Sequence, residues 1–331
     1  MGLAKFIKRK LIRCQSPSAV AVAVATPQKQ SNSDFPLTWE EIQALTTDFA
    51  TVIGYGGFST VYLAQFRRST AAVKVYCSSQ RVYEAFKQEL QILLHLRHPN
   101  IVKLLGYAEE QGALIMEFVP NGTLHHKLHA SNTTPLTWNQ RAAVAFQLAA
   151  AIAYLHDACS PHIVHADIKP SNVLLDDALN CKLCDFGSAR VGFSSAVAPG
   201  KRRSTAAMIM GSPGYTDPLY LRTGLVSKKN DVYSFGVVVL ELITGIEAFC
   251  PATGERLASR AAPLLRNAAE MVDPRLRRGE VDMGEVGALA ALAAKCISET
   301  PGIRPSASEI LTTMREAIPS LAFMFHKKLL V

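Results

Sequence analysis

The sequence predicts an α+β fold of two lobes: a small antiparallel β lobe with one helix, and a larger, mainly helical lobe. The chain has 331 residues, 49% of them hydrophobic and 19% charged, which suits one two-lobed domain with tails. Strand-like runs gather before residue 118, and helical patterns dominate after it. Between them, Phe-Val-Pro-Asn-Gly at residues 118–122 has the chemistry of a turn and predicts a hinge.

The first part of the chain divides into a tail and the small lobe. Residues 1–37 are basic at first and then rich in Ser, Ala, Val, Pro and Gln, so a tail without fixed structure in isolation is expected. Thr38 and Glu41 form a capping-box pattern, which predicts a short helix beginning near Trp39. The small lobe is expected at residues 38–118. Its strands are predicted around the glycine-rich run at 54–61 and at 71–76, 102–107 and 113–118.

Helical periodicity predicts the remaining elements. One small-lobe helix is expected at 81–96, and its apolar residues share one face: Val82, Phe86, Leu90, Leu93 and Leu94. The large lobe is expected at residues 119–320, with a C-terminal tail at 321–331. Its helices are predicted at 139–158, 232–242, 284–298 and 307–317, and the first of these is Ala-rich and expected to be buried.

One short segment carries the clearest chemistry. Residues 165–172 read His-Ala-Asp-Ile-Lys-Pro-Ser-Asn and bring together an acid, a cation and an amide. Transfer of a phosphoryl group needs a carboxylate for the hydroxyl proton (Asp167), a cation for the moving phosphate (Lys169) and an oxygen ligand for a metal ion (Asn172). Turn or capping residues are the alternative interpretation of Asp167 and Asn172.

Other segments agree with this chemistry. Gly-Tyr-Gly-Gly-Phe-Ser-Thr-Val at 54–61 brings backbone N–H groups close to phosphates, because glycine has no Cβ. A strand-like run ends in Lys74, and Glu89 lies in the following helical pattern as its expected partner. Asp185 begins an Asp-Phe-Gly run, which adds a second carboxylate downstream of the loop. For Lys74, the alternative is a solvent-exposed strand residue.

The order of these segments resembles a protein kinase, with its G-x-G-x-x-G-x-V, V-A-I-K, H-R-D-x-K-x-x-N and D-F-G motifs. Residues 38–318 resemble the plant receptor-like kinase (Pelle-related) family more closely. The runs that carry this resemblance include T-W-E-E-I at 38–42, T-W-N-Q-R at 137–141, D-V-Y-S-F-G at 231–236, M-V-D-P-R-L at 271–276 and R-P at 304–305.

The resemblance implies an ATP-dependent Ser/Thr protein kinase that acts in receptor-linked signalling. It implies catalytic roles for Lys74, Glu89, Asp167 and Lys169, and binding of Mg²⁺ or Mn²⁺ by Asn172 and Asp185. Lys169 favours Ser/Thr over Tyr substrates, and His165 and Asp231 are expected to be structural. Nucleotide contacts are expected from Lys74 and from Ile53, Gly54, Gly56, Gly57, Val61, Ala72, Met116, Phe118 and Leu174.

Three residues depart from the kinase pattern. Ser59 replaces the third glycine of the loop, and Ala166 replaces the Arg that would pair with an activation-loop phosphate. The chain therefore resembles the non-RD kinases, and weak dependence on activation-loop phosphorylation is expected. Leu219 replaces the Glu that normally pairs with the Arg matching Arg304, so Arg304 should find carbonyls or Glu299, or turn to solvent.

Other functional classes were weighed against a kinase. A catalytically weak pseudokinase scaffold that binds nucleotide or a receptor partner is the main alternative, and Ala166 and Leu219 are its only support. A dinucleotide-binding oxidoreductase is disfavoured because the glycine loop lacks its third Gly. The net charge of +8 does not favour nucleic acid, because no such motif is present. A lone C-x-x-C (Cys181 and Cys184) and the histidines at 125, 126 and 129 do not complete a metal site.

The tail suggests where the protein acts. No secretory signal or membrane span is apparent, which places the chain in the receptor-like cytoplasmic kinase branch. A basic run at residues 5–13, with Gly2 and Cys14 as lipidation sites, suggests contact with the inner leaflet of the plasma membrane. The alternative is an organellar transit peptide. Protein substrates and a receptor kinase are the expected partners.

Overall fold

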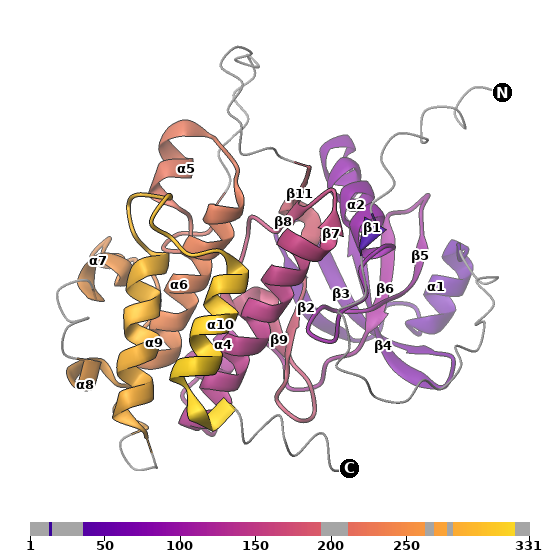
Figure 1. Cartoon of the computed structure of the whole chain (residues 1–331). Helices are drawn as coiled ribbons and strands as arrows, with labels where there is room; N and C mark the ends of the chain where they lie inside the picture. The colour runs from indigo at the N-terminus through magenta and orange to yellow at the C-terminus, as the bar shows by residue number, and fades with distance from the viewer. Residues whose placement is uncertain (1–12, 15–35, 193–210, 262–267, 277–280, 322–331) are drawn as a thin grey trace, which may run out of the picture.

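A computed structural model describes residues 13–14, 36–192, 211–261, 268–276 and 281–321. A small lobe with a β-sheet lies beside a larger helical lobe, and the short strands β8, β9 and β11 lie between them (Figure 1). The predicted α+β fold of two lobes is therefore confirmed.

The small lobe is built on a five-stranded antiparallel sheet with the order β2-β3-β4-β6-β5. Within it Lys74 on β4 lies opposite Val61 on β3 and Leu114 on β6, so Lys74 sits on an interior strand. The strands predicted at 71–76, 102–107 and 113–118 are present, with ends that differ by at most two residues, and two further strands form around the glycine-rich run. The elements of this lobe are α1 (Trp39–Leu45), β2 (Val52–Gly56), β3 (Ser59–Phe66), β4 (Ser69–Tyr76), α2 (Gln80–Leu93), β5 (Leu104–Ala108) and β6 (Ala113–Glu117).

Local signals in the sequence define both helices of this lobe. The predicted capping box at α1 is present, because Thr38 and Glu41 cap each other's backbone N–H groups. Ser79 caps α2 by accepting a hydrogen bond from the Val82 N–H. Leu94, expected on the buried face, is 39% exposed because the helix ends one residue before it.

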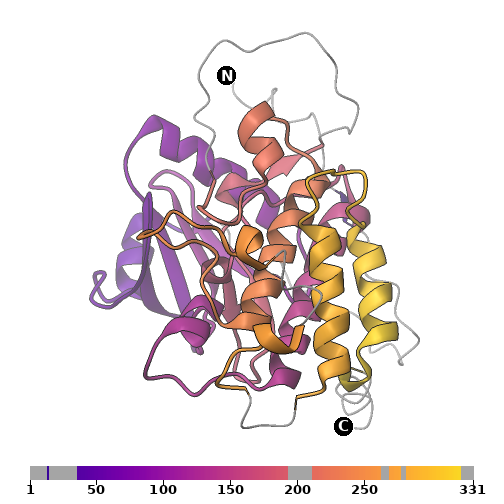
Figure 2. The same cartoon turned by 90° about the vertical axis from the view of Figure 1, so that its left-hand side faces the viewer.

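Long helices form the large lobe, and α6 packs against both α4 and α9. Figures 1 and 2 both show α9 and α10 running side by side. The helix predicted at 139–158 is α4 with a π-helical turn (Tyr154–Ala158) after it. The helices of this lobe are α3 (Leu124–His129), α4 (Trp138–Ala153), α5 (Pro218–Thr223), α6 (Lys228–Thr244), α7 (Leu257–Ala261), α8 (Ala268–Met271), α9 (Met283–Cys296) and α10 (Ala307–Ala317).

Several short strands and 3₁₀ turns complete the fold. Two of them form an antiparallel pair after the hinge, β9 (Val173–Leu175) with β10 (Cys181–Leu183). The others are β1 (Arg13–Cys14), β7 (Cys159–Ser160), β8 (Ile163–Val164), β11 (Arg190–Val191) and the 3₁₀ turns η2 (Pro170–Asn172) and η3 (Phe186–Ser188).

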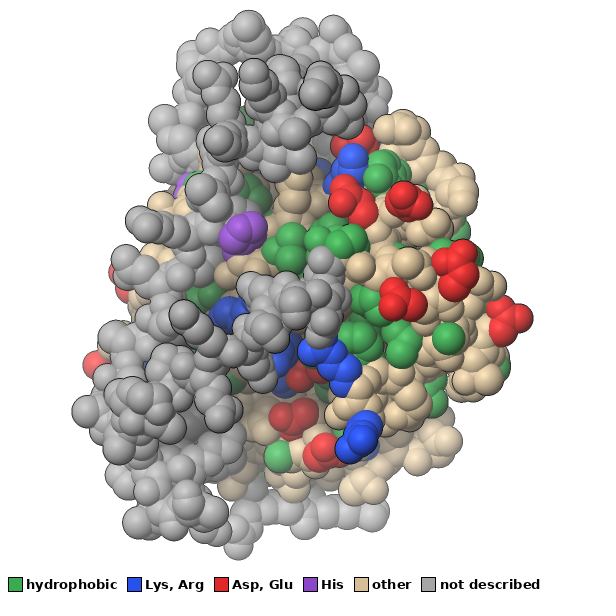
Figure 3. All heavy atoms as spheres, turned by 90° about the vertical axis from the view of Figure 1, so that its right-hand side faces the viewer, with side chains coloured by type: hydrophobic (Ala, Val, Ile, Leu, Met, Phe, Trp, Pro, Cys, Tyr) green, Lys and Arg blue, Asp and Glu red, His purple; other side chains and the backbone are tan. Residues whose placement is uncertain are grey.

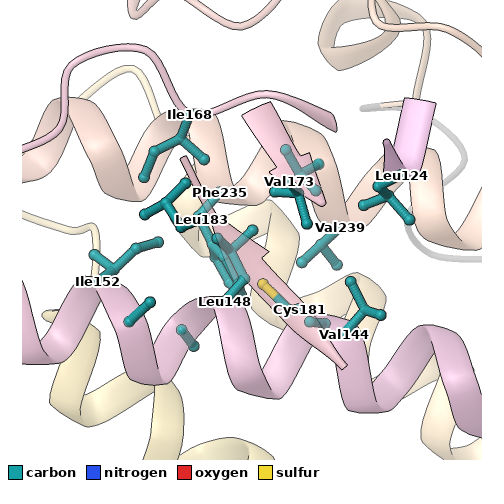
Figure 4. Close-up of a cluster of buried hydrophobic side chains, with 14 of the residues drawn as sticks. Leu124, Val144, Leu148, Ile152, Ile168, Val173, Cys181, Leu183, Phe235 and Val239 are labelled. Atoms are coloured by element: carbon teal, nitrogen blue, oxygen red, sulfur yellow. The ribbon is translucent and has the colours of Figure 1, made fainter. Parts of the chain in front are cut away.

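The core of the large lobe reaches the loop at residues 165–172. Ile168 lies within this loop and is fully buried in the same cluster as Leu148 on α4 and Phe235 on α6 (Figure 4). Burying a side chain of this size stabilises the fold by about 1.5–3 kcal/mol. The loop is therefore anchored to the two central helices by hydrophobic packing, which fixes the polar residues on either side of Ile168.

The surface is mixed in character. On the face in Figure 3, described Lys and Arg side chains are interspersed with Asp and Glu. Among the residues that the structure describes, no helix is long and apolar enough to cross a membrane.

Candidate active site

The loop at residues 165–172 is held by a buried carboxylate. Asp231, fully buried on α6, accepts hydrogen bonds from the backbone N–H groups of His165 and Ala166, each at 2.8 Å. Its Oδ2 also lies 2.8 Å from His156 Nε2. Because Asp231 binds backbone, this anchor does not depend on the side chain at position 166. Ala166 itself adopts a left-handed conformation with φ of 64°.

The polar residues of this loop converge on one carboxylate. Lys169 Nζ lies 2.8 Å from Asp167 Oδ2, and the side-chain N–H of Asn172 donates to the same oxygen at 3.0 Å. The other oxygen accepts a hydrogen bond from the Ser212 hydroxyl at 2.8 Å, and Lys169 also donates to Ser212. The structure thus brings all three predicted loop residues together. Ser212 was not among the predicted site residues, because it lies 45 residues from Asp167.

A second cluster forms where the lobes meet. Lys74 Nζ lies 2.8 Å from Glu89 Oε2 and 2.9 Å from Asp185 Oδ1. Burial alone would lower the pKa of Lys74, but the carboxylates of Glu89 and Asp185 outweigh it and hold the pKa well above its ordinary value. Burial alone would raise the pKa of Asp185, but the charge and hydrogen bond of Lys74, together with His165 and Lys169, outweigh it and lower the pKa. Lys74 is 7% exposed, so it is not a solvent-exposed strand residue.

Glu89 also reaches the D-F-G segment. Its Oε1 accepts a hydrogen bond from the backbone N–H of Phe186, and its Oε2 accepts one from the Tyr76 hydroxyl. Its neighbour Gln88 donates to the carbonyl of Ala189. Tyr76 was missed in the sequence analysis, although its position two residues after Lys74 places both side chains on one face of β4.

Several of the predicted nucleotide-binding residues lie on the strand of Lys74 or on the strands paired with it. Gly54 pairs with Val61 across β2 and β3, and Ala72 pairs with Met116 across β4 and β6. Leu174 on β9 lies beside the hinge, since its neighbour Leu175 exchanges backbone hydrogen bonds with the hinge at residues 121–122. The remaining contacts predicted around the adenine and phosphates are Ile53, which is 41% exposed, Gly56, Gly57 and Phe118.

Gly56 has a local reason to be glycine. A Cβ at this position would lie 2.7 Å from Ser59 Oγ, which is too close without a shift. Ser59 replaces a third glycine, so the tip of the loop tolerates this serine only while residue 56 stays small.

Arg304 finds a partner that the sequence analysis did not anticipate. It is 1% exposed and makes two hydrogen bonds to Asp217, from Nη1 to Oδ2 at 2.5 Å and from Nη2 to Oδ1 at 3.1 Å. It also donates to the backbone carbonyls of Ser298 and Lys229, so the expected contact with carbonyls is present. Contact with Glu299 and an outward turn to solvent were wrong, because Asp217 supplies a buried carboxylate two residues before Leu219.

The histidines at 125, 126 and 129 and the cysteines of the C-x-x-C run lie in different environments. His125 and His126 are exposed, and no group of three or more metal-ligating side chains forms within the described ranges. His129 differs, because it is partly buried with Nε2 3.8 Å from Glu241. Cys181 and Cys184 are free, and burial raises the pKa of both thiols.

Fold and site together define the class of protein, a protein kinase. The protein kinase domain family matches residues 48–314, and the chain belongs to that family. It is 50% identical over 305 residues to a probable receptor-like protein kinase of Arabidopsis thaliana. The aligned segment covers 87% of this chain and 89% of the relative.

Two further relatives are also receptor-like kinases of plants. Salt tolerance receptor-like cytoplasmic kinase 1 of Oryza sativa subsp. japonica is 50% identical over 297 residues, covering 86% of this chain and 81% of that protein. A probable LRR receptor-like serine/threonine-protein kinase of Arabidopsis thaliana is 37% identical over 328 residues, covering 95% of this chain and 36% of that protein. The chain is a member of the plant receptor-like Ser/Thr protein kinases, and it acts on proteins with ATP.

Proposed function

We propose that this kinase is catalytically active and that Asp167 is its base. Asp167 orients the substrate hydroxyl and accepts its proton late in the transfer, while Lys169 neutralises charge on the moving γ-phosphate. Lys74 binds the α- and β-phosphates. One observation supports this proposal above the others: Lys74 Nζ contacts both Glu89 and Asp185, at 2.8 and 2.9 Å. An active kinase needs that pair and the D-F-G carboxylate in place at once.

Asn172 and Asp185 have the chemistry to bind Mg²⁺ or Mn²⁺. Asn172 uses its side-chain N–H on Asp167, and its side-chain oxygen makes no hydrogen bond to a described residue. Asp185 gives one oxygen to Lys74 and keeps the other for a ligand. Two protein oxygens suit Mg²⁺, which takes its remaining ligands from phosphates and water. The metal would shield the charge of the phosphates, while these two residues hold it beside Lys74.

The nucleotide lies between the lobes in this proposal. The small lobe spans residues 38–118 and supplies the glycine loop, and the large lobe spans residues 119–320. Tails at 1–37 and 321–331 flank them. The adenine ring packs against apolar side chains from both lobes: Ile53, Val61, Ala72, Met116, Phe118 and Leu174.

An autophosphorylation and peptide-transfer assay with Mg-ATP tests this proposal. Wild type, Asp167→Asn and Lys74→Glu are purified in parallel, and their unfolding midpoints are compared to verify folding. Wild type is expected to transfer phosphate, and each variant is expected to lose at least about a hundredfold in rate. Equal incorporation in all three proteins would refute it. Leu219 gives the pseudokinase alternative less support than the sequence suggested, because Arg304 pairs with the carboxylate of Asp217.

Regulation is expected to follow the non-RD pattern. Ala166 provides no cation for an activation-loop phosphate, so phosphorylation of Ser204 or Thr205, which lie outside the described residues, should change activity little. Alanine and glutamate variants at both positions are compared with phosphatase-treated wild type. A change of about tenfold or more in kcat would contradict this pattern.

The tail is proposed to bring the kinase to the inner face of the plasma membrane, near a receptor kinase partner. Residues 1–12 and the side chains of Arg13 and Cys14 lie outside what the structure describes, so this proposal rests on the sequence. Fractionation of tagged wild type, Gly2→Ala and Cys14→Ser tests it. Recovery of all three in the soluble fraction would reject it, and recovery in an organelle would favour the transit-peptide alternative.

A further inference from the structure

Tyr76 contacts both members of the Lys74–Glu89 pair. Its hydroxyl donates to Glu89 Oε2, the same oxygen that accepts from Lys74. The centre of its ring lies 4.9 Å from Lys74 Nζ, close enough for a cation–π contact. The ring also packs edge-on against Phe86 of α2, with centroids 5.6 Å apart. One side chain of β4 thus touches the catalytic lysine, its carboxylate partner and the helix that carries that carboxylate.

The Glu89 carboxylate is fully buried and depends on its donors. It receives hydrogen bonds from Lys74, from Tyr76 and from the Phe186 N–H. Removing one donor leaves part of a buried charge unsatisfied, and hydrogen bonds to charged groups are among the stronger ones in proteins. The Tyr76 hydroxyl remains a donor at neutral pH, because burial, followed by the Glu89 charge, raises its pKa.

We infer that Tyr76 is a positioning residue, which holds Glu89 against Lys74 and keeps α2 in its catalytic position without an activation-loop phosphate. The inference rests on the proposed function, in which Ala166 leaves the enzyme without the usual Arg–phosphate link. Gln88, the neighbour of Glu89, also links α2 to the segment after D-F-G, because its side-chain N–H donates a hydrogen bond to the carbonyl of Ala189. The same helix turn is thereby joined to β4 and to the D-F-G segment by contacts within the fold.

The test compares Tyr76→Phe with a matched control, Tyr83→Phe. Tyr83 also stacks on Phe86, with centroids 5.8 Å apart, and its hydroxyl makes no hydrogen bond among the described residues. Both substitutions remove one hydroxyl and keep the ring. The full chain is treated with phosphatase, and kcat and KM are measured with Mg-ATP and a peptide substrate. The same Tyr76→Phe change is also made in a Glu89→Ala background.

Tyr76→Phe is expected to lower kcat about tenfold, with KM for the peptide within about twofold of wild type. Tyr83→Phe should stay within about twofold of wild type in both quantities. In the Glu89→Ala background, Tyr76→Phe should cause no further loss, because the hydroxyl no longer has an acceptor to position. A merely structural role would give equal losses in both backgrounds.

Two results would overturn the inference in distinguishable ways. If treated wild type and Tyr76→Phe are equally active, or if the loss is the same with and without Glu89, Tyr76 does not act through Glu89 and the proposed function stands. If treated wild type itself is inactive, the phosphate-independent arrangement is refuted, and this inference fails with it.

Discussion

Replacing Asp217 by Ala should destabilise the large lobe more than any other loss of a single helix cap. Asp217 and Arg304 are both almost fully buried, and two of the hydrogen bonds of Arg304 end on this carboxylate. Removing one partner of a buried pair costs about 3–5 kcal/mol, because the other charge stays buried. Asp217 also accepts from Asn230 and caps α5 through the Leu219 N–H. We expect a loss of about 4 kcal/mol, out of the 5–15 kcal/mol typical of a folded domain.

Denaturant unfolding of the full chain measures this loss. Asp282→Ala is the matched control, because Asp282 caps α9 by accepting from the N–H groups of Gly284 and Glu285 but has no arginine partner among the described residues. It should cost only about 1 kcal/mol. Leu219→Glu, which restores the acid of the kinase pattern, should change stability by no more than about 0.5 kcal/mol, because Arg304 is already paired. Equal losses for the two Asp variants, or a large gain from Leu219→Glu, would refute the reasoning.

Three further substitutions test other residues of the large lobe. Burial raises the pKa of Glu241 to about 8, above the ~4.3 of an unfolded Glu, so its contribution to stability is full at low pH and is lost as pH rises through 8. Between about pH 5 and 8, the unfolding midpoint of wild type should therefore fall with rising pH more than that of Glu241→Gln. Equal pH dependence of the two midpoints would contradict this. Ser212→Ala should lower kcat about tenfold, because it removes the hydroxyl that accepts a hydrogen bond from Lys169, while Ser212→Thr should retain activity. An unchanged kcat in Ser212→Ala would show that this hydroxyl does not position Lys169. Ala166→Gly should raise the unfolding free energy by about 0.5 kcal/mol, because glycine adopts the positive φ freely; a lower value would show that Ala166 is not strained.

Signals that act over a few residues were predictable from the sequence. The capping box of Thr38 and Glu41 begins α1 where it was expected, because both partners lie within one helical turn. Motif order also predicted that Glu89 would pair with Lys74, and the two lie 2.8 Å apart, whereas the contact of Lys74 with Asp185, 111 residues further on, was not predicted. That expectation came from the resemblance to kinases, since local periodicity says nothing about which strands and helices become neighbours.

Contacts that depend on tertiary packing were not predictable. The sequence showed that Arg304 lacked its usual carboxylate but not which acid would replace it, and Asp217 lies 87 residues away. Tyr76 could have been noticed from its two-residue spacing to Lys74, but only the position of α2 brings its hydroxyl to Glu89. In both cases a buried charge selects its partner from the side chains that the fold brings within reach, and that set is a property of the assembled lobes.

The two departures that favoured an inactive scaffold have different consequences in the fold. Ala166 removes a side chain, but Asp231 fixes the loop through the backbone N–H groups of residues 165 and 166, so the position of Asp167 does not require an Arg there. Leu219 removes a carboxylate, but Asp217 provides one from within the same segment. Neither departure leaves a buried charge unpaired in the described residues. In our proposal the departures change control, because an enzyme whose loop and α2 are held by internal contacts has less need of an activation-loop phosphate to hold them.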